Sequence, residues 1–243
     1  MRQQAFFTMI LLGCGAPPAQ QQPTADDVIA KYIEAIGGAK RLAAVQTMKM
    51  TGRASIADGK MDTPVTVLLK RPSSTRLELT YQGQTLLQVF DGSAGWVLVP
   101  MTSPRPEPAT PDEVEQMRDA SDFDGPLVNY GAKGYRVANQ GLESALGERV
   151  WKLQVIRPNG TEQLLYISAA TWLPIETIVR RKQGDKVVEV ESYPGDYRLV
   201  DGLKFPFSME QKAEGHSVMK MIFSKIELNN GVADSAFKMP EGK

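Results

Sequence analysis

The chain has 243 residues, with 28 basic and 28 acidic side chains, so its formal net charge is zero. That balance excludes the basic surface that binding to a nucleic-acid backbone needs. The single cysteine, Cys14, and the single histidine, His216, exclude cysteine-rich zinc sites, disulfide frameworks and CxxC redox motifs. The composition favours a protein that binds a ligand without catalysis, and we expect no metal and no cofactor.

The first residues indicate export rather than part of the fold. Residues 5–12 (AFFTMILL) form an apolar run of secretory length, much shorter than the ~20 residues of a membrane-spanning helix. We predict a signal peptide at residues 1–13 and a flexible Pro- and Gln-rich tether at residues 14–25. Leu11-Leu12-Gly13-Cys14 resembles the lipobox of bacterial lipoproteins. The resemblance implies a periplasmic or cell-envelope protein anchored to the outer membrane through a lipidated Cys14; a plain cleaved signal peptide is the alternative.

An amphipathic helix is expected directly after the tether. Thr24 begins a capping-box-like sequence, and acidic residues occupy the first turn. Apolar residues then recur at helical spacing until Gly37-Gly38. A second short helix is predicted over residues 39–45.

From Thr47 onward the hydrophobic period changes to two. Short runs of Val, Leu, Thr and Ile alternate with turn signals such as Asp58-Gly59, Asp91-Gly92 and Asn159-Gly160. This pattern predicts a mainly β (α+β) domain over residues 26–243, with about eleven strands in one large curved antiparallel sheet. No parallel crossover is expected.

A Pro-rich stretch interrupts the strands. Residues 100–111 (PMTSPRPEPATP) contain five prolines and cannot form an interior strand. Thr110 as cap, Pro111 at the first position and Glu113 at the third predict a helix start. We therefore expect a helical lid insertion over about residues 100–131. Its carboxylates, including Asp122 and Asp124, are interpreted as a solvated acidic surface, with a hydrolytic pair as the alternative.

The end of one predicted strand carries the most informative side chain. In the run VTVLLKRP (residues 65–72), Val65, Val67, Leu69 and Arg71 share one face. A guanidinium that ends an apolar row needs carbonyl or carboxylate partners, because an unpaired buried charge costs several kcal/mol. The alternative is that Arg71 reaches solvent at the strand end.

Three motifs resemble the LolA/LolB-type lipoprotein carriers. They are Lys70-Arg71-Pro72 at a strand end, Asp91-Gly92-x-x-x-Trp96-x-x-x-Pro100 in the following region, and Phe237-x-x-Pro240-x-Gly242 near the end of the chain. The resemblance implies a β half-barrel whose apolar concave face lies under a lid of short helices and holds acyl chains. In these carriers the arginine of the first motif holds the lid shut from inside, a role that the resemblance carries over to Arg71.

On this basis six residues are predicted to line the lidded cavity: Arg71, Leu69, Val67, Leu79, Trp96 and Leu98. Trp151, Leu153, Tyr166 and Phe223 are further candidates, with core packing as the alternative. Methionine is frequent, at 11 residues, with Met48 and Met50 on one strand face and Met219 and Met221 on another. Flexible thioethers suit an adaptable lipid surface, although gap filling in a core is the alternative.

The sequence thus predicts non-catalytic binding and transfer of lipid or lipoprotein acyl chains in the bacterial envelope, of the outer-membrane lipoprotein-sorting type. The alternative is an envelope sensor or scaffold of the same fold that binds a protein partner. An enzyme is not expected, because His216 follows Glu214-Gly215 in a hairpin turn, where we expect it to be exposed.

Overall fold

The fold begins with a capped helix. In the computed structural model, which describes residues 22–183 and 186–240, α1 (Ala25–Ala35) starts after Thr24. The Asp27 backbone N donates to Thr24 Oγ1 over 3.2 Å, and the Thr24 backbone N donates to the Asp27 carboxylate over 2.8 Å, as the capping box predicted. Helix α2 (Ala39–Ala44) follows. The predicted signal peptide, Cys14 and the tether up to residue 21 lie outside the described residues.

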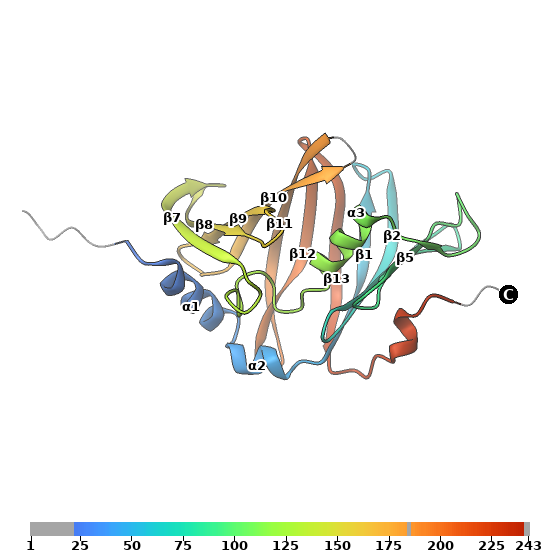
Figure 1. The fold of residues 1–243 in the computed structure, drawn as a ribbon, viewed down its shortest axis with the longest axis horizontal. Coiled ribbons are helices and arrows are strands. Elements are labelled where there is room, and N and C mark those ends of the chain that lie inside the picture. Colours follow the sequence, from blue (N-terminus) through green and yellow to red (C-terminus); the bar gives the residue numbers. More distant parts are fainter. Residues whose placement is uncertain (1–21, 184–185, 241–243) are drawn as a thin grey trace, which may run out of the picture.

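Thirteen strands form one open antiparallel sheet in the part of the chain that the structure describes (Figure 1). Their order is β6-β5-β4-β3-β2-β1-β13-β12-β11-β10-β9-β8-β7, so β1 pairs with the last strand and β6 and β7 form the two edges. The strands are β1 (Thr47–Ile56), β2 (Met61–Lys70), β3 (Ser74–Tyr81), β4 (Gln84–Phe90), β5 (Gly95–Leu98), β6 (Glu107–Pro108), β7 (Arg136–Ala145), β8 (Glu148–Ile156), β9 (Glu162–Ser168), β10 (Pro174–Gln183), β11 (Lys186–Val200), β12 (Leu203–Ala213) and β13 (His216–Leu228). The predicted fold class is confirmed. The predicted number of strands is two too low.

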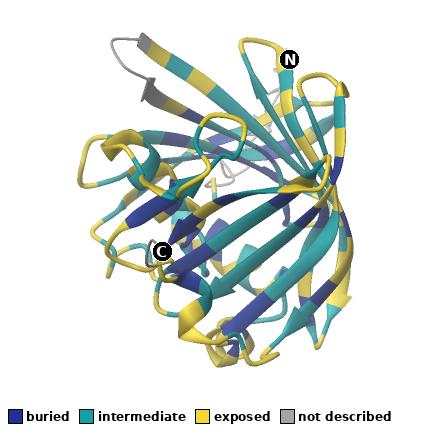
Figure 2. Cartoon of the chain, turned by 90° about the vertical axis from the view of Figure 1, so that its right-hand side faces the viewer, coloured by how far each residue is buried: buried dark blue, intermediate teal, exposed yellow. Residues whose placement is uncertain are grey.

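Local irregularities bend this sheet. Its pairing register shifts at Thr51/Gly52 in β1, and similar shifts occur in β7, β10 and β12. Each such bulge increases the local twist and bends the strand. At Gly52 the approach to β13 is close enough that an added Cβ would lie 2.1 Å from the Ile222 carbonyl oxygen, so only glycine fits. The strands show buried, half-buried and exposed residues in alternation (Figure 2).

The predicted insertion contains one helix. Helix α3 (Pro111–Ala120) starts after Thr110 with a second capping box, in which the Glu113 backbone N donates to Thr110 Oγ1 over 3.3 Å. Turns follow over residues 121–134. The helix packs against β5, where an added Cβ on Gly95 would lie 2.9 Å from Met117 Sδ. We call α1, α2, α3 and residues 121–134 the lid, and the side of the sheet that they contact the lid face.

Three apolar clusters lie on the lid face. The first joins Val28 and Ile29 of α1 to strands β8 and β9. The second joins α1 and α2 to Val128 of the lid and Leu203 of β12. The third spreads over β1, β2, β3, β12 and β13, and includes Phe123 of the lid. The core is therefore a layer between the curved sheet and the lid.

The opposite side of the sheet, the outer face, is partly covered by the C-terminal segment (residues 229–240). Phe237, in the short 3₁₀ helix Asp234–Phe237, is buried against strands β4 and β5. Trp96 Nε1 donates to the Phe237 carbonyl O over 3.2 Å, and Arg76 Nη1 donates to that of Ala236 over 2.8 Å. Lys70 Nζ donates to the Val232 carbonyl O over 2.9 Å. These contacts fix the segment across the ends of β2 to β5.

Candidate functional site

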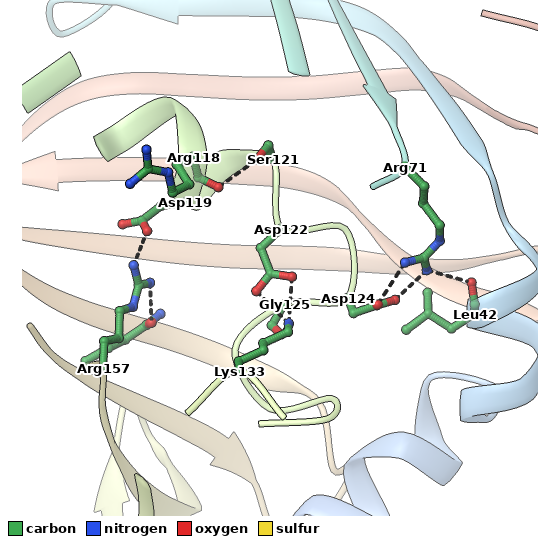
Figure 3. Close-up of polar contacts among 11 residues, drawn as sticks. Leu42, Arg71, Arg118, Asp119, Ser121, Asp122, Asp124, Gly125, Lys133 and Arg157 are labelled. Atoms are coloured by element: carbon green, nitrogen blue, oxygen red, sulfur yellow. Dashed lines mark hydrogen bonds and ion pairs between the residues drawn. The ribbon is translucent and has the colours of Figure 1, made fainter. Parts of the chain in front are cut away.

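Arg71 lies directly after β2, and its guanidinium contacts the lid (Figure 3). It forms a bidentate ion pair with Asp124, with Nη1 2.8 Å from Oδ2 and Nη2 2.5 Å from Oδ1. Nε donates to the Val45 carbonyl O over 2.7 Å, and Nη2 donates to the Leu42 carbonyl O over 3.1 Å. The guanidinium carbon also lies 4.6 Å from the centroid of the Phe123 ring. Arg71 thus contacts α2 and residues 121–134 at the same time.

The Arg71–Asp124 pair is largely removed from solvent and stays ionised. The two side chains are 20% and 18% exposed. The hydrogen bonds from Arg71 lower the pKa of Asp124, against the opposing effect of burial. A carboxylate with a lowered pKa stabilises the fold above its ordinary pKa and loses this contribution only as the pH falls through the lower value. The expected carbonyl and carboxylate partners of Arg71 are confirmed, and the alternative in which its side chain reaches solvent is wrong.

Three acidic residues of the lid, Asp119, Asp122 and Asp124, are paired and largely buried rather than solvated. Lys133 Nζ donates to Asp122 over 2.6 Å and to the Gly125 carbonyl O over 2.6 Å. Arg157, from the turn after β8, forms an ion pair with Asp119, and both side chains are mostly buried (Figure 3). The interpretation of a solvated acidic surface is therefore wrong for Asp119, Asp122 and Asp124, whereas Glu115 on α3 is exposed as expected. It failed because the partners are distant in sequence, Asp124 lying 53 residues from Arg71, and no local pattern marks them.

A further polar contact fixes the outer side of α3. Asn159 Nδ2, in the β8–β9 turn, donates to Glu115 Oε1 over 2.6 Å. Beside this contact lies a cleft of about 440 Å³ whose lining includes Glu115, Glu162 and Arg180. Its charged lining does not suit an acyl chain. The apolar lid face is therefore the better candidate for an acyl site.

Four of the six predicted lining residues lie on the lid face. Val65, Val67 and Leu69 alternate with outward-facing residues along β2, and Arg71 continues that row. Leu79 is opposite Val65 on β3 and belongs to the same cluster. Val67 and Leu69 are half-buried.

Trp96 and Leu98 lie on the outer face, so the prediction that they line the lidded face is wrong. They are opposite Val89 and Leu87 on β4 and pack around Phe237 of the C-terminal segment. Strand alternation tells which residues share a face, but it does not tell which face the lid covers. The sequence offered no signal that the C-terminal segment would cover the outer face.

The further candidates for the lining also lie partly on the lid face and partly away from it. Leu153 and Trp151 pack in the cluster under α1, and Phe223 packs in the cluster near β1 and β2. Tyr166 alternates with Leu165 of the lid face and lies under the Lys152 ammonium, which is 5.4 Å from its ring centroid. His216 is exposed at the start of β13, as expected. Among the described residues, no cluster of three or more His, Cys, Asp or Glu side chains is arranged to hold a metal ion.

Among the solved structures with the same fold are three bacterial proteins. A DUF1329 family protein from Desulfovibrio piger has a TM-score of 0.61 at 14% identity, covering 88% of this chain and 96% of that one. A LolA superfamily protein from Nitrosomonas europaea has a TM-score of 0.58 at 16% identity, covering 89% and 98%. A protein described as an outer membrane lipoprotein-sorting domain, from Vibrio parahaemolyticus, has a TM-score of 0.53 at 12% identity, covering 86% and 97%.

No protein-family model and no curated protein matches the sequence. Within residues 22–183 and 186–240, no helix has the length and apolar character needed to cross a membrane. At these identities the structural matches establish the fold, and they cover nearly the whole length of each matched chain. The open antiparallel sheet under a helical lid is therefore a LolA/LolB-like fold.

Proposed function

We propose that this protein binds acyl chains of lipids or lipoproteins without catalysis, and transfers them within the bacterial cell envelope. The observation that carries the proposal is the lid face itself. Beside its buried residues, the lid face carries apolar side chains on β1, β2, β3 and β13 that are only half-buried, although a lid held by Arg71 lies on the same side of the sheet; they include Met50, Val67, Leu69, Leu77 and Met221. A half-buried apolar surface of this extent gains free energy when an apolar ligand covers it.

The lid contacts are of a strength that an acyl chain can overcome. A hydrogen bond to a charged group contributes ~1.5–3 kcal/mol to stability. Burial of one methylene contributes ~0.8 kcal/mol. On this scale about two to four methylenes offset one such bond. Arg71 donates four of them, so about eight to fifteen buried methylenes, the length of a long acyl chain, are needed to displace the lid from Arg71. The empty, closed form and the loaded, open form are then close enough in free energy to exchange.

Anchoring through Cys14 is part of the same proposal. Residues 1–21 lie outside the described part of the chain, so the support comes from the lipobox-like sequence alone. Location in the periplasm or at the outer membrane also belongs to the proposal. Intact mass measurement of the protein purified from its native envelope reports acylation of Cys14 directly.

The decisive experiment compares Arg71→Leu with the wild-type protein. Protein is purified from the envelope without detergent exchange, bound lipid is extracted and identified by mass spectrometry, and the affinity for a fluorescent fatty acid is measured. Since the Arg71 contacts favour the closed form, the variant should retain more lipid and bind the probe roughly tenfold more tightly. Asp124→Asn should act in the same direction.

A matched control distinguishes the effect of releasing the lid from the general effect of losing an ion pair. Arg53 on β1 pairs with Asp62 at the surface, where both side chains are 59% exposed. Arg53→Leu should leave lipid content and probe affinity unchanged. If the wild-type protein carries no lipid and binds no fatty-acid probe, the proposal is wrong, and a sensor or scaffold that binds a protein partner becomes the better explanation.

A further inference from the structure

Four methionines gather on the lid face at the end of the strands remote from Arg71. On β1, Ile56 is paired with Met61 of β2 on one side and with Met219 of β13 on the other. Met221 is paired with Met209 of β12. Paired side chains of an antiparallel sheet lie about 5 Å apart on one face. Met61, Met209, Met219 and Met221, which we call the thioether cluster, therefore form one patch that is joined through Ile56.

The position of the thioether cluster leaves it accessible. All four residues are half-buried, whereas Met48, opposite Leu69 near Arg71, is only 4% exposed. Helix α3 packs against β3, β4 and β5, and α1 packs against β7, β8 and β9 near the opposite edge of the sheet. Met61 lies ten residues before Arg71, or roughly 30 Å along an extended strand. The cluster thus lies far from the contacts that hold the lid.

Resting on the proposed function, we propose that the thioether cluster is an oxidation site that controls acyl-chain binding. A two-electron oxidant such as hypochlorous acid is the reactant. The methionine sulfur gives up two electrons and gains one oxygen atom, and the oxidant leaves as chloride and a proton. The product is methionine sulfoxide, which is polar and no longer matches an apolar ligand.

The effect on binding follows from the chemistry of the patch. Thioethers are apolar, flexible and polarisable, so they adapt to acyl chains of different shape. A sulfoxide oxygen accepts hydrogen bonds from water. Contact with a methylene chain removes these water molecules and offers no hydrogen-bond donor in their place, so burial of the sulfoxide costs free energy. The oxidised protein should therefore bind a fatty-acid probe about tenfold more weakly or worse. A bound acyl chain should, in turn, slow the oxidation of these four residues.

The test treats the full-length protein with hypochlorous acid and locates each sulfoxide by peptide mass spectrometry. We expect sulfoxides at the thioether cluster before Met48, together with the loss of affinity for the fluorescent fatty acid. Treatment with both classes of methionine sulfoxide reductase and a dithiol should restore the affinity. A variant with all four cluster residues changed to leucine should bind the probe within about threefold of wild type and resist the oxidant.

Three further variants control for sulfoxides outside the cluster, for polarity alone and for misfolding of the fourfold variant. Met101 and Met239 are 54% and 42% exposed and lie outside the cluster, so M101L/M239L should lose affinity on oxidation as the wild type does. Met221→Gln introduces a polar side chain without any oxidant and should weaken binding by itself. If the fourfold variant does not fold, M219L/M221L should give partial resistance.

The outcomes distinguish the two proposals. A reduced protein that does not bind the probe contradicts the proposed function. A reduced protein that binds the probe, and binds it equally well once sulfoxides are mapped to the cluster, overturns the oxidation site alone. The oxidation site is also overturned if the fourfold leucine variant loses affinity as the wild type does, because the sensitive group would then lie elsewhere.

Discussion

Glu176 is a carboxylate on β10 with only 9% of the residue exposed. Burial raises its pKa, and the nearby carboxylates of Glu191 and Glu189 act in the same direction. A hydrogen bond with Tyr193 and the ammonium of Lys212 oppose the rise without cancelling it. A buried carboxyl with a raised pKa carries no such cost below its unfolded-state pKa, and stability is lost as the pH rises from that value through its folded-state pKa.

We therefore expect Glu176→Gln to stabilise the protein at pH 8 and to change it little near pH 4. Thermal unfolding at the two pH values measures this difference, which should amount to a few degrees at pH 8. Glu214→Gln, at an exposed turn position, is the control and should show no such pH dependence. Equal melting temperatures for wild type and Glu176→Gln at pH 8 would show that the carboxylate is stabilised by its hydrogen bonds.

At the scale of single residues, the sequence predicts on which face of the sheet a side chain lies better than it predicts which residues that side chain contacts. The row formed by Val65, Val67, Leu69 and Arg71 follows from strand alternation alone, and the structure places it as predicted. The need of Arg71 for a buried partner also follows from its position. The sequence position of Arg71 does not tell that this partner is Asp124, because the contact depends on how residues 121–134 fold back over the sheet.

At the scale of elements, capping and periodicity predicted the helices well. Thr24 and Thr110 each cap a helix as their sequences indicated, because the capping box is a purely local arrangement. The position of α3 over β5 could not be predicted in this way, since it depends on a small residue in a distant strand. At Gly95, an added Cβ would lie 3.2 Å from Val114 Cγ2 and 3.3 Å from Ala109 Cβ.

Gly95→Val should therefore displace α3 and open the lid. We expect the uptake rate of the fluorescent fatty acid to rise several-fold, because the closed form loses its packing against β5. Stopped-flow fluorescence measures the rate. Gly131→Val is the matched control, since a Cβ at Gly131 meets nothing within 4 Å. An unchanged uptake rate in Gly95→Val would mean that α3 does not limit access to the lid face.

At the scale of the whole molecule, the lid contacts and the C-terminal segment meet at one junction. The Gln46 backbone N donates to Asn229 Oδ1 over 2.7 Å, and the Arg71 backbone N donates to the Gln46 carbonyl O over 3.0 Å. Lys70 Nζ forms an ion pair with Asp234 at 2.6 Å, in addition to its bond to Val232. These contacts thus connect three parts of the chain: the segment between α2 and β1, the end of β2, and the start of the C-terminal segment.

Release of the lid should therefore loosen the C-terminal segment. We expect backbone amides of residues 229–238 to exchange hydrogen faster in the acyl-loaded protein than in the empty one, because opening removes the contact of Arg71 with Val45. Hydrogen exchange with mass spectrometry measures this. Amides of β8 and β9, far from the junction, serve as the internal reference. Equal exchange of residues 229–238 in both states would show that the two faces are independent.

At this junction two consecutive residues, Lys70 and Arg71, contact opposite faces of the sheet. Lys70 contacts the C-terminal segment on the outer face, while the next residue contacts the lid on the other face. A single peptide bond therefore separates the interior of the molecule from its exterior at this point. We expect that a ligand that draws Arg71 away from Asp124 also shifts the backbone that carries Lys70. Under the proposed function, the outer face should therefore differ in structure between the loaded and the empty protein.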